Sequence, residues 1–165
     1  MDNLLDLFSH IRVFIFDMDG VLTDGNVLAT EDGQLLRSIN IKDVYALSHA
    51  ARKGYTIWVM TAGISEPLQK RFTDMGISVY SDVKDKAALL NELVATTQHT
   101  FNSMLYMGDD IPDVEAMQIC LLPTCPNDAV NEVRSVAKYI SPKNGGKGCV
   151  RDVIEKVLRL HADWQ

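Results

Sequence analysis

Cysteine is scarce in this 165-residue chain, which has only Cys120, Cys125 and Cys149 and no C-x-x-C spacing. A disulfide framework and a zinc site are therefore not expected, and we predict buried free thiols. The four histidines are also scattered, without the spacing of a metal-binding pair. We expect them at the surface or at helix ends.

Positive charge is scarce as well, with 16 Lys and Arg against 22 Asp and Glu and a formal net charge of −6. This balance argues against nucleic acid as a partner. No apolar run approaches the ~20 residues of a membrane span, and residues 1–10 have acids but no basic stretch before an apolar one. We therefore expect no membrane partner and a cytoplasmic location.

The overall composition is typical of a globular domain, with 47% hydrophobic and 23% charged residues. A chain of this length can bury a full core, so we predict a single domain over residues 1–165. Apolar runs of strand length alternate with segments of helical period, which predicts βαβ units. The expected fold is α/β, a three-layer Rossmann-like parallel sheet with helices on both faces.

Asp32-Gly33 lies between two short extended runs and adds a short β-hairpin flap to this fold. The expected strands are 11–16, 55–60, 78–80, 103–107, 119–122 and 139–140, the hairpin runs are 27–30 and 34–39, and the expected helices are 43–53, 66–75, 86–96, 129–136 and 150–161.

Two carboxylates, Asp17 and Asp19, directly follow the first apolar run. Strand alternation would point them to opposite faces, so a turn at Gly20 is needed to bring both to one site. Such a pair favours a divalent metal, with Asp17 as a nucleophile and Asp19 as a group that gives and takes a proton. An Asx turn with a solubilising acid is the alternative for this segment alone.

Further polar residues follow the later strands: Thr61, Lys86 at a helix start, and then Asp109, Asp110 and Asp113. Ligands of parallel sheets bind at the carboxyl ends of the strands, so these residues are expected to share one site. Each alone has an ordinary interpretation, as a strand end, a solvated lysine or a capped turn. Their joint order at successive strand ends favours the functional interpretation.

All of these groups have a role if the substrate is a phosphate monoester. Asp17, Asp109 and the backbone carbonyl of Asp19 would hold Mg²⁺, which prefers oxygen ligands. The Thr61 hydroxyl and nearby N–H groups would bind phosphoryl oxygens, and Lys86 would neutralise the nucleophile and the developing charge.

The segment Asp17-Met18-Asp19-Gly20-Val21, with Thr61, Lys86 and Gly108-Asp109-Asp110 plus Asp113, resembles the four motifs of the haloacid dehalogenase-like phosphatase superfamily over about residues 11–158. The sequence shows no inserted cap domain, and in this respect the chain resembles the capless group of that superfamily. Residues 22–25, 40–43 and 144–152 are similar to the family of 3-deoxy-D-manno-octulosonate 8-phosphate phosphatases.

This resemblance implies Mg²⁺-dependent hydrolysis of a sugar-acid phosphate through an aspartyl-phosphate, in lipopolysaccharide sugar biosynthesis. The implied roles are Asp17 as nucleophile, Asp19 as acid/base, Thr61, Ala62 and Lys86 as phosphate-binding residues, Asp109 as metal ligand, and Asp110 and Asp113 as supports of the metal and its water shell.

The family also forms homotetramers in which neighbouring subunits cover the open site. The resemblance implies that the loop 145–148, with Lys147, reaches a neighbour's site or gates its own; a flexible connector is the alternative. Lys42 and Asp43 are candidates for sugar contact, or simply a helix start.

One departure affects the substrate. Family members often have arginine in a Thr/Ser-Gly-Arg or Thr-Gly-Gly-Arg pattern, whereas this chain has Thr61-Ala62-Gly63-Ile64. Isoleucine does not bind a carboxylate, so either a cation elsewhere in the chain holds the carboxylate of the substrate, or the substrate is a different one.

Three other functions remain open from the sequence. The first is a phosphatase for another sugar-acid phosphate, such as a nonulosonate 9-phosphate. The second is a receiver-like signalling domain, in which the acid pair precedes the phosphorylated aspartate; here Asp109-Asp110 comes late in the chain. The third is a non-catalytic oligomerisation domain, which does not need the retained acids and lysine.

Overall fold

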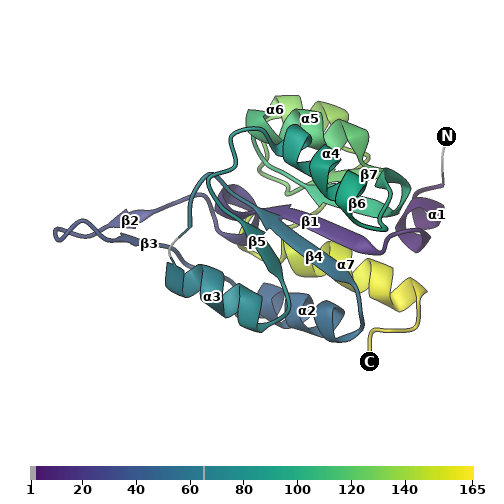
Figure 1. Ribbon diagram of the computed structural model, residues 1–165, viewed down its shortest axis with the longest axis horizontal. Coiled ribbons are helices and arrows are strands. Elements are labelled where there is room, and N and C mark those ends of the chain that lie inside the picture. The colour runs from purple at the N-terminus through teal and green to yellow at the C-terminus, as the bar shows by residue number, and fades with distance from the viewer. Residues whose placement is uncertain (1–2, 65) are drawn as a thin grey trace.

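The computed structural model describes residues 3–64 and 66–165. Residues 1–2 and 65 of the expected single domain lie outside the described residues. A parallel sheet with the strand order β5-β4-β1-β6-β7-β8 forms the middle layer (Figure 1). Its strands are β1 (Val13–Asp17), β4 (Thr56–Met60), β5 (Ser78–Tyr80), β6 (Met104–Met107), β7 (Leu122–Cys125) and β8 (Tyr139–Ile140).

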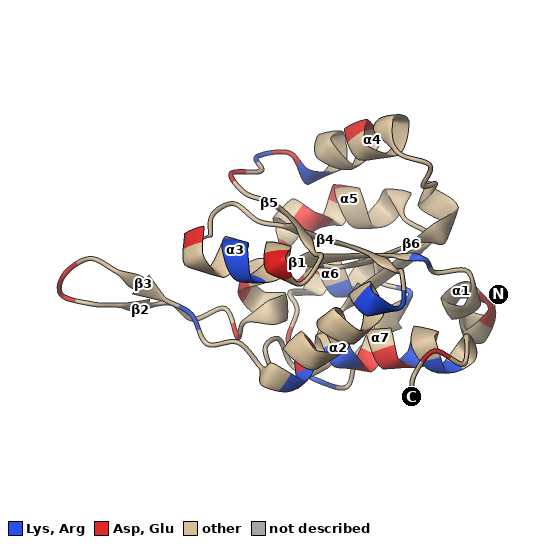
Figure 2. Ribbon diagram, turned by 60° about the horizontal axis from the view of Figure 1, so that its bottom comes forward, with Lys and Arg blue, Asp and Glu red and all other residues tan. Residues whose placement is uncertain are grey.

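Helices cover both faces of this sheet, as the sequence predicts (Figure 1). One face carries α1 (Leu4–Ser9), α2 (Ile41–Arg52), α3 (Glu66–Asp74) and α7 (Cys149–Leu160), and the other carries α4 (Lys86–Thr96), α5 (Val114–Ile119) and α6 (Asn131–Val136). Acidic and basic residues alternate along the outside of α7 (Figure 2).

Each face has its own apolar core, and β1 contributes to both in alternation. Phe14 and Phe16 belong to the core under α2 and α7, whereas Val13 and Ile15 belong to the core under α4 and α5. Asp17 continues the second series, because side chains two apart share a face. The last residue of β1 is therefore directed toward the α4 side.

The expected strand over residues 119–122 is wrong. Ile119 ends the helix α5, and the strand runs over Leu122–Cys125. Proline is unusual in an inner strand, so Pro123 obscured this one, and a six-residue helix is too short to show a clear period. The short helix α1 has no counterpart among the predicted elements for the same reason.

The β-hairpin flap is confirmed, although its strands are shorter than expected. β2 (Leu28–Ala29) and β3 (Leu35–Leu36) pair antiparallel and project away from the sheet (Figure 1). The loop 145–148, which precedes α7, packs against the turn that follows β1.

The thiols of Cys120, Cys125 and Cys149 are free and buried, as predicted. Within residues 3–64 and 66–165, no helix has the length and apolar character that crossing a membrane requires.

Candidate active site

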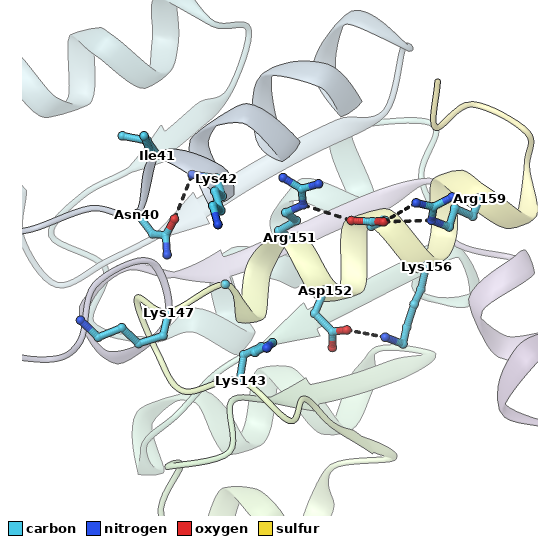
Figure 3. Close-up of a pocket in the computed structure, with 11 residues that line it drawn as sticks. Asn40, Ile41, Lys42, Lys143, Lys147, Arg151, Asp152, Lys156 and Arg159 are labelled. Carbon is cyan, nitrogen blue, oxygen red and sulfur yellow. Dashed lines mark hydrogen bonds and ion pairs between the residues drawn. The ribbon is translucent and has the colours of Figure 1, made fainter.

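The candidate site residues divide between two cavities. The larger, of about 530 Å³, is lined by Lys42, Lys143, Lys147 and charged residues of α7 (Figure 3). The smaller, of about 340 Å³, contains Asp17, Asp19, Thr61, Ala62, Lys86, Asp109, Asp110 and Asp113. The predicted phosphatase chemistry is thus gathered in the smaller cavity, and Lys42 and Lys147 lie outside it.

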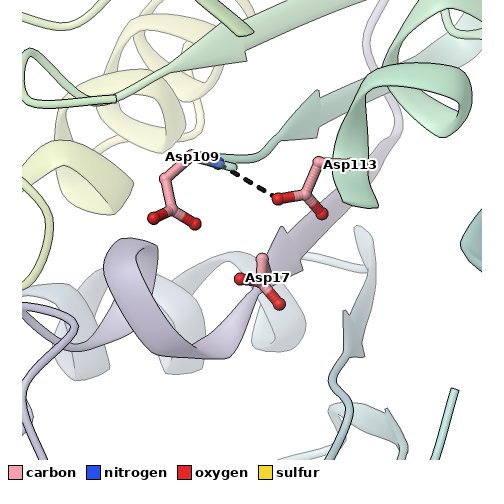
Figure 4. Close-up of side chains that lie close together, drawn as sticks. All are labelled: Asp17, Asp109 and Asp113. Carbon is pink, nitrogen blue, oxygen red and sulfur yellow. Dashed lines mark hydrogen bonds between the residues drawn. The ribbon is translucent and has the colours of Figure 1, made fainter. Parts of the chain in front are cut away.

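Sheet register explains this convergence. Asp17 is paired with Met60 and Phe16 with Met107, so Thr61 and Gly108 leave the sheet beside Asp17. Three carboxylates from two strand ends face one another there (Figure 4).

The chain turns at Gly20, as the sequence predicts. Gly20 has φ +96°, and a Cβ at this position would lie 1.9 Å from Asp109 Oδ2. Only glycine allows this backbone conformation beside the Asp109 carboxylate without strain. The turn brings Asp19 into the same cavity as Asp17.

Lys86 links two of the acids. Its Nζ donates to Asp17 Oδ1 at 2.7 Å and to Asp113 Oδ1 at 2.6 Å, and the side chain is 7% exposed. Burial alone would lower the pKa of Lys86, but the charges of Asp17 and Asp113 outweigh it and raise the pKa. Lys86 is therefore a charged residue of the site and not a solvated helix lysine.

Asp113 has a positioning role that sequence reasoning did not give it. Oδ1 also accepts the hydroxyl of Tyr106 at 2.9 Å, and Oδ2 accepts the backbone N–H groups of Asp109 and Asp110 at 3.1 and 3.4 Å. Both oxygens are thus occupied by donors of the protein. Asp113 holds Lys86 and fixes the loop that carries Asp109.

Asp109 fits a cation ligand. Its Oδ1 is buried and has no hydrogen-bond partner. Burial, with the charges of Asp17 and Asp113, raises the pKa of Asp109 to about 8. Burial and the charge of Asp113 likewise raise the pKa of Asp17 to about 6, against the opposite effect of Lys86.

Asp17, Asp109 and Asp113 each place an oxygen within 4.8 Å of the others. Because both oxygens of Asp113 are taken, Asp17 and Asp109 are the side chains that would hold a divalent cation, and a hard one such as Mg²⁺ suits carboxylate oxygens. The Asp110 carboxylate is exposed and accepts the N–H of Ile111 at 2.7 Å, so it caps the following turn. Its contribution to metal binding stays a prediction.

Thr61 is almost fully buried at the end of β4, and its hydroxyl donates to the carbonyl of Gly63 at 3.1 Å. Ala62 follows it in the cavity wall. Their place beside Asp17 agrees with the predicted binding of a phosphoryl group, which itself stays a prediction.

Arg37 is a site residue that the sequence reasoning missed. It donates from Nε and Nη2 to the two oxygens of Asp19, at 2.8 and 3.0 Å. The absence of an arginine at Ile64 predicts that a cation elsewhere in the chain holds the carboxylate of the substrate. Arg37 lies eighteen positions after Asp19 in the sequence, and only the fold of the hairpin brings the two side chains together.

The loop 145–148 is not a flexible connector. The N–H of Gly146 donates to the carbonyl of Val21 at 2.9 Å, and a Cβ at Gly145 would lie 1.9 Å from the carbonyl oxygen of Gly20. Asp43 is buried and accepts the N–H groups of Gly148 and Arg151, so it caps α7 and is not a sugar contact of this chain's cavity. The role of Lys147 in a neighbour's site or as a gate of its own, and a sugar contact by Lys42, stay predictions.

Comparison with known proteins gives consistent matches over almost the whole chain, although no family model matches it. The 3-deoxy-D-manno-octulosonate 8-phosphate phosphatase KdsC of Yersinia pestis is 29% identical over 158 residues, 95% of this chain and 84% of that protein. The protein of the same name from Escherichia coli K12 is 27% identical over 150 residues, 90% of this chain and 80% of that protein.

Solved structures agree with this. The Yersinia pestis phosphatase has a TM-score of 0.93 at 28% identity, covering 98% of this chain and 88% of that one. The Moraxella catarrhalis phosphatase, solved with magnesium, phosphate and KDO, has a TM-score of 0.91 at 27% identity, covering 97% and 92%. A Legionella pneumophila hydrolase of HAD subfamily III A has a TM-score of 0.91 at 28% identity, covering 96% and 88%.

Proposed function

Since the chain is a haloacid dehalogenase-like phosphatase of the capless group, we propose that it is a Mg²⁺-dependent phosphatase that hydrolyses 3-deoxy-D-manno-octulosonate 8-phosphate in lipopolysaccharide sugar biosynthesis. The observation that carries this proposal is the cavity in which Lys86, Asp17 and Asp109 meet, in a fold shared with enzymes of that name. Nothing in this arrangement requires a cap domain.

The first half of the reaction uses Asp17 and Asp19. Lys86 holds one Asp17 oxygen at 2.7 Å, which leaves the other to form a bond to phosphorus while the bond from phosphorus to the sugar oxygen breaks. Asp19 gives its proton to that leaving oxygen. The sugar acid leaves, and the phosphoryl group stays on Asp17.

The second half uses the same residues in reverse roles. Asp19 takes a proton from a water molecule, which attacks phosphorus as the bond to Asp17 breaks, and phosphate leaves. A Mg²⁺ ion held by Asp17 and Asp109 would neutralise charge on the carboxylates and phosphoryl oxygens. Lys86 and Thr61 bind the phosphoryl oxygens during both halves.

The chemistry of this site acts on the phosphate group, so the phosphate ester of another sugar acid is also a candidate substrate. The segment Thr61-Ala62-Gly63-Ile64 lacks the family's arginine, which leaves room for a different sugar acid, and a nonulosonate 9-phosphate is the second candidate substrate.

The proposed enzyme is a cytoplasmic homotetramer. Leu28, Leu35 and Leu36 of the hairpin are 65%, 57% and 47% exposed, and apolar strands exposed in this way favour pairing with another copy. Three buried free thiols suit a reducing compartment.

Phosphate release from a panel of phosphorylated sugar acids tests the proposal. The highest kcat/KM is expected for 3-deoxy-D-manno-octulosonate 8-phosphate. A preference for a nonulosonate 9-phosphate would move the function to the second candidate. A protein that becomes phosphorylated but does not turn over would indicate a receiver-like domain, and no reaction with any ester would contradict a phosphatase.

A further inference from the structure

One arginine of the hairpin segment reaches into the site. Arg37 follows β3 and pairs with both oxygens of Asp19. The Arg37 side chain is 13% exposed, whereas Leu35 and Leu36 just before it are 57% and 47% exposed. The segment therefore directs this cation inward and its leucines outward.

The same guanidinium lies beside the segment that lacks the family's arginine. Arg37 Nη2 lies 3.4 Å from the carbonyl oxygen of Gly63. Ile64, the next residue, packs against the apolar core and brings no polar group to the site. Arg37 thus supplies a guanidinium, from another part of the chain, where the segment after Thr61 has none.

The pair with Asp19 has to open during the reaction. The leaving oxygen accepts a proton from one Asp19 oxygen, and Arg37 donates to both of these oxygens. Arg37 is only partly exposed, so it needs a new partner when the pair opens, because a charge shielded from water and left unpaired is costly. A carboxylate on the substrate offers the same two-oxygen geometry.

We propose that Arg37 binds the carboxylate of the sugar-acid substrate and exchanges Asp19 for it, so that recognition of the sugar acid frees the acid/base. This inference rests on the proposed function, because it requires a substrate with a carboxylate as well as a phosphate. Arg37 is then the residue that determines specificity for sugar acids.

Steady-state kinetics on two esters test this assignment: 3-deoxy-D-manno-octulosonate 8-phosphate, and p-nitrophenyl phosphate, which has no carboxylate. Arg37→Gln is expected to raise KM for the sugar-acid phosphate about ten-fold more than KM for the aryl phosphate. Arg37→Lys should give an intermediate ratio, because an ammonium group does not pair with two oxygens in parallel.

Lys84→Gln is the matched control. Lys84 is an exposed cation that lines the same cavity, so its loss removes the same charge without a contact to Asp19. It is expected to change the two KM values in the same proportion.

A rescue variant sharpens the test. A Cβ at Gly63 meets no atom within 4 Å, so Gly63→Arg has space and places an arginine where the family's Thr/Ser-Gly-Arg pattern has one. The double variant Arg37→Gln/Gly63→Arg is expected to regain part of the preference for the sugar-acid phosphate.

Three outcomes distinguish a failure of the proposed function from a failure of the role of Arg37. A wild-type enzyme without preference for the carboxylate-bearing ester would contradict the proposed function. A wild-type preference that persists unchanged in Arg37→Gln, or in Arg37→Lys where the glutamine variant fails to fold, would overturn the role of Arg37 alone. An equal loss of kcat on both esters with an unchanged KM ratio would show that Arg37 serves only Asp19.

Discussion

Asp17 lies in a set of contacts that fix one of its oxygens and leave the other for chemistry. Lys86 contacts Asp17, Asp113 holds Lys86, and Tyr106 holds Asp113 from within the sheet. In the proposed mechanism, such preorganised contacts cost no rearrangement when Asp17 attacks phosphorus. The sequence predicts Asp17, which follows an apolar run, and Lys86, which begins a helix, but a tyrosine within a strand gives no sign that its hydroxyl reaches Asp113.

The first residue-scale prediction is for Asp17→Asn. The substitution keeps nearly the same volume, so the fold should be retained, but an amide does not act as the nucleophile. We expect phosphatase activity to fall by at least about a thousand-fold, measured as phosphate release, with an unchanged circular dichroism spectrum. Activity within tenfold of wild type would rule out Asp17 as the nucleophile.

Asp19→Asn separates the two half-reactions. The variant lacks the proton donor for the leaving oxygen, so hydrolysis of an alkyl phosphate should be severely slowed. An aryl phosphate has a better leaving group and should partly restore phosphorylation of the enzyme. The measurement is the burst of alcohol or phenol release in single-turnover experiments, and equal defects on alkyl and aryl esters would argue against an acid role.

At the scale of elements, the sequence predicts the long helices and most strands, including the short β5 and β8, but it misses two six-residue helices. The runs that became β1, β4 and β6 are strongly apolar, whereas α1 and α5 have six residues each. The site at the carboxyl ends of the strands is predictable because parallel order places those ends together. The contact of Arg37 with Asp19 is not, because it depends on the path of the hairpin.

The hairpin gives the element-scale prediction. Wild-type protein should be a homotetramer by light scattering, and Leu28→Glu should shift it toward smaller species, because a charge replaces an exposed apolar contact. Leu5→Glu is the control, since Leu5 is 62% exposed on α1 and away from the hairpin. A monomeric wild-type protein at assay concentration would contradict the proposed assembly.

At the scale of the whole molecule, charge sets the dependence on metal and pH. The chain has a net charge of −6, and its site gathers Asp17, Asp109 and Asp113, of which Asp17 and Asp113 pair with Lys86. A phosphate ester adds further negative charge, so the anionic cavity needs a cation to bind it. Burial and neighbouring acids raise the pKa of Asp17 to about 6 and of Asp109 to about 8.

These raised pKa values predict how stability depends on pH. Between about pH 4 and pH 8 the metal-free folded protein binds protons that the unfolded chain releases, so its free energy of unfolding should fall as pH rises. Mg²⁺ binds the deprotonated carboxylates of the folded state, so its stabilising effect should grow over the same range.

Calorimetry in chelator and in excess Mg²⁺, at about pH 5 and about pH 8, measures both effects. Asp109→Asn is the control variant, and it should lose most of the Mg²⁺-induced rise in Tm. A metal-free Tm that increases between the two pH values would contradict the raised pKa values of Asp17 and Asp109. An equal Mg²⁺ effect at both pH values would contradict the assignment of these two residues as the cation ligands.

The central claim is that Asp17 becomes phosphorylated during turnover, and trapping the phosphoenzyme tests it most directly. Borohydride reduces an aspartyl-phosphate to homoserine, so protein quenched during turnover of 3-deoxy-D-manno-octulosonate 8-phosphate with Mg²⁺ can be reduced, digested and analysed by mass spectrometry. We predict homoserine at position 17, and none in Asp17→Asn or in chelator. Homoserine at Asp19 or Asp109 instead, or no reduced residue under conditions of full turnover, would contradict the account.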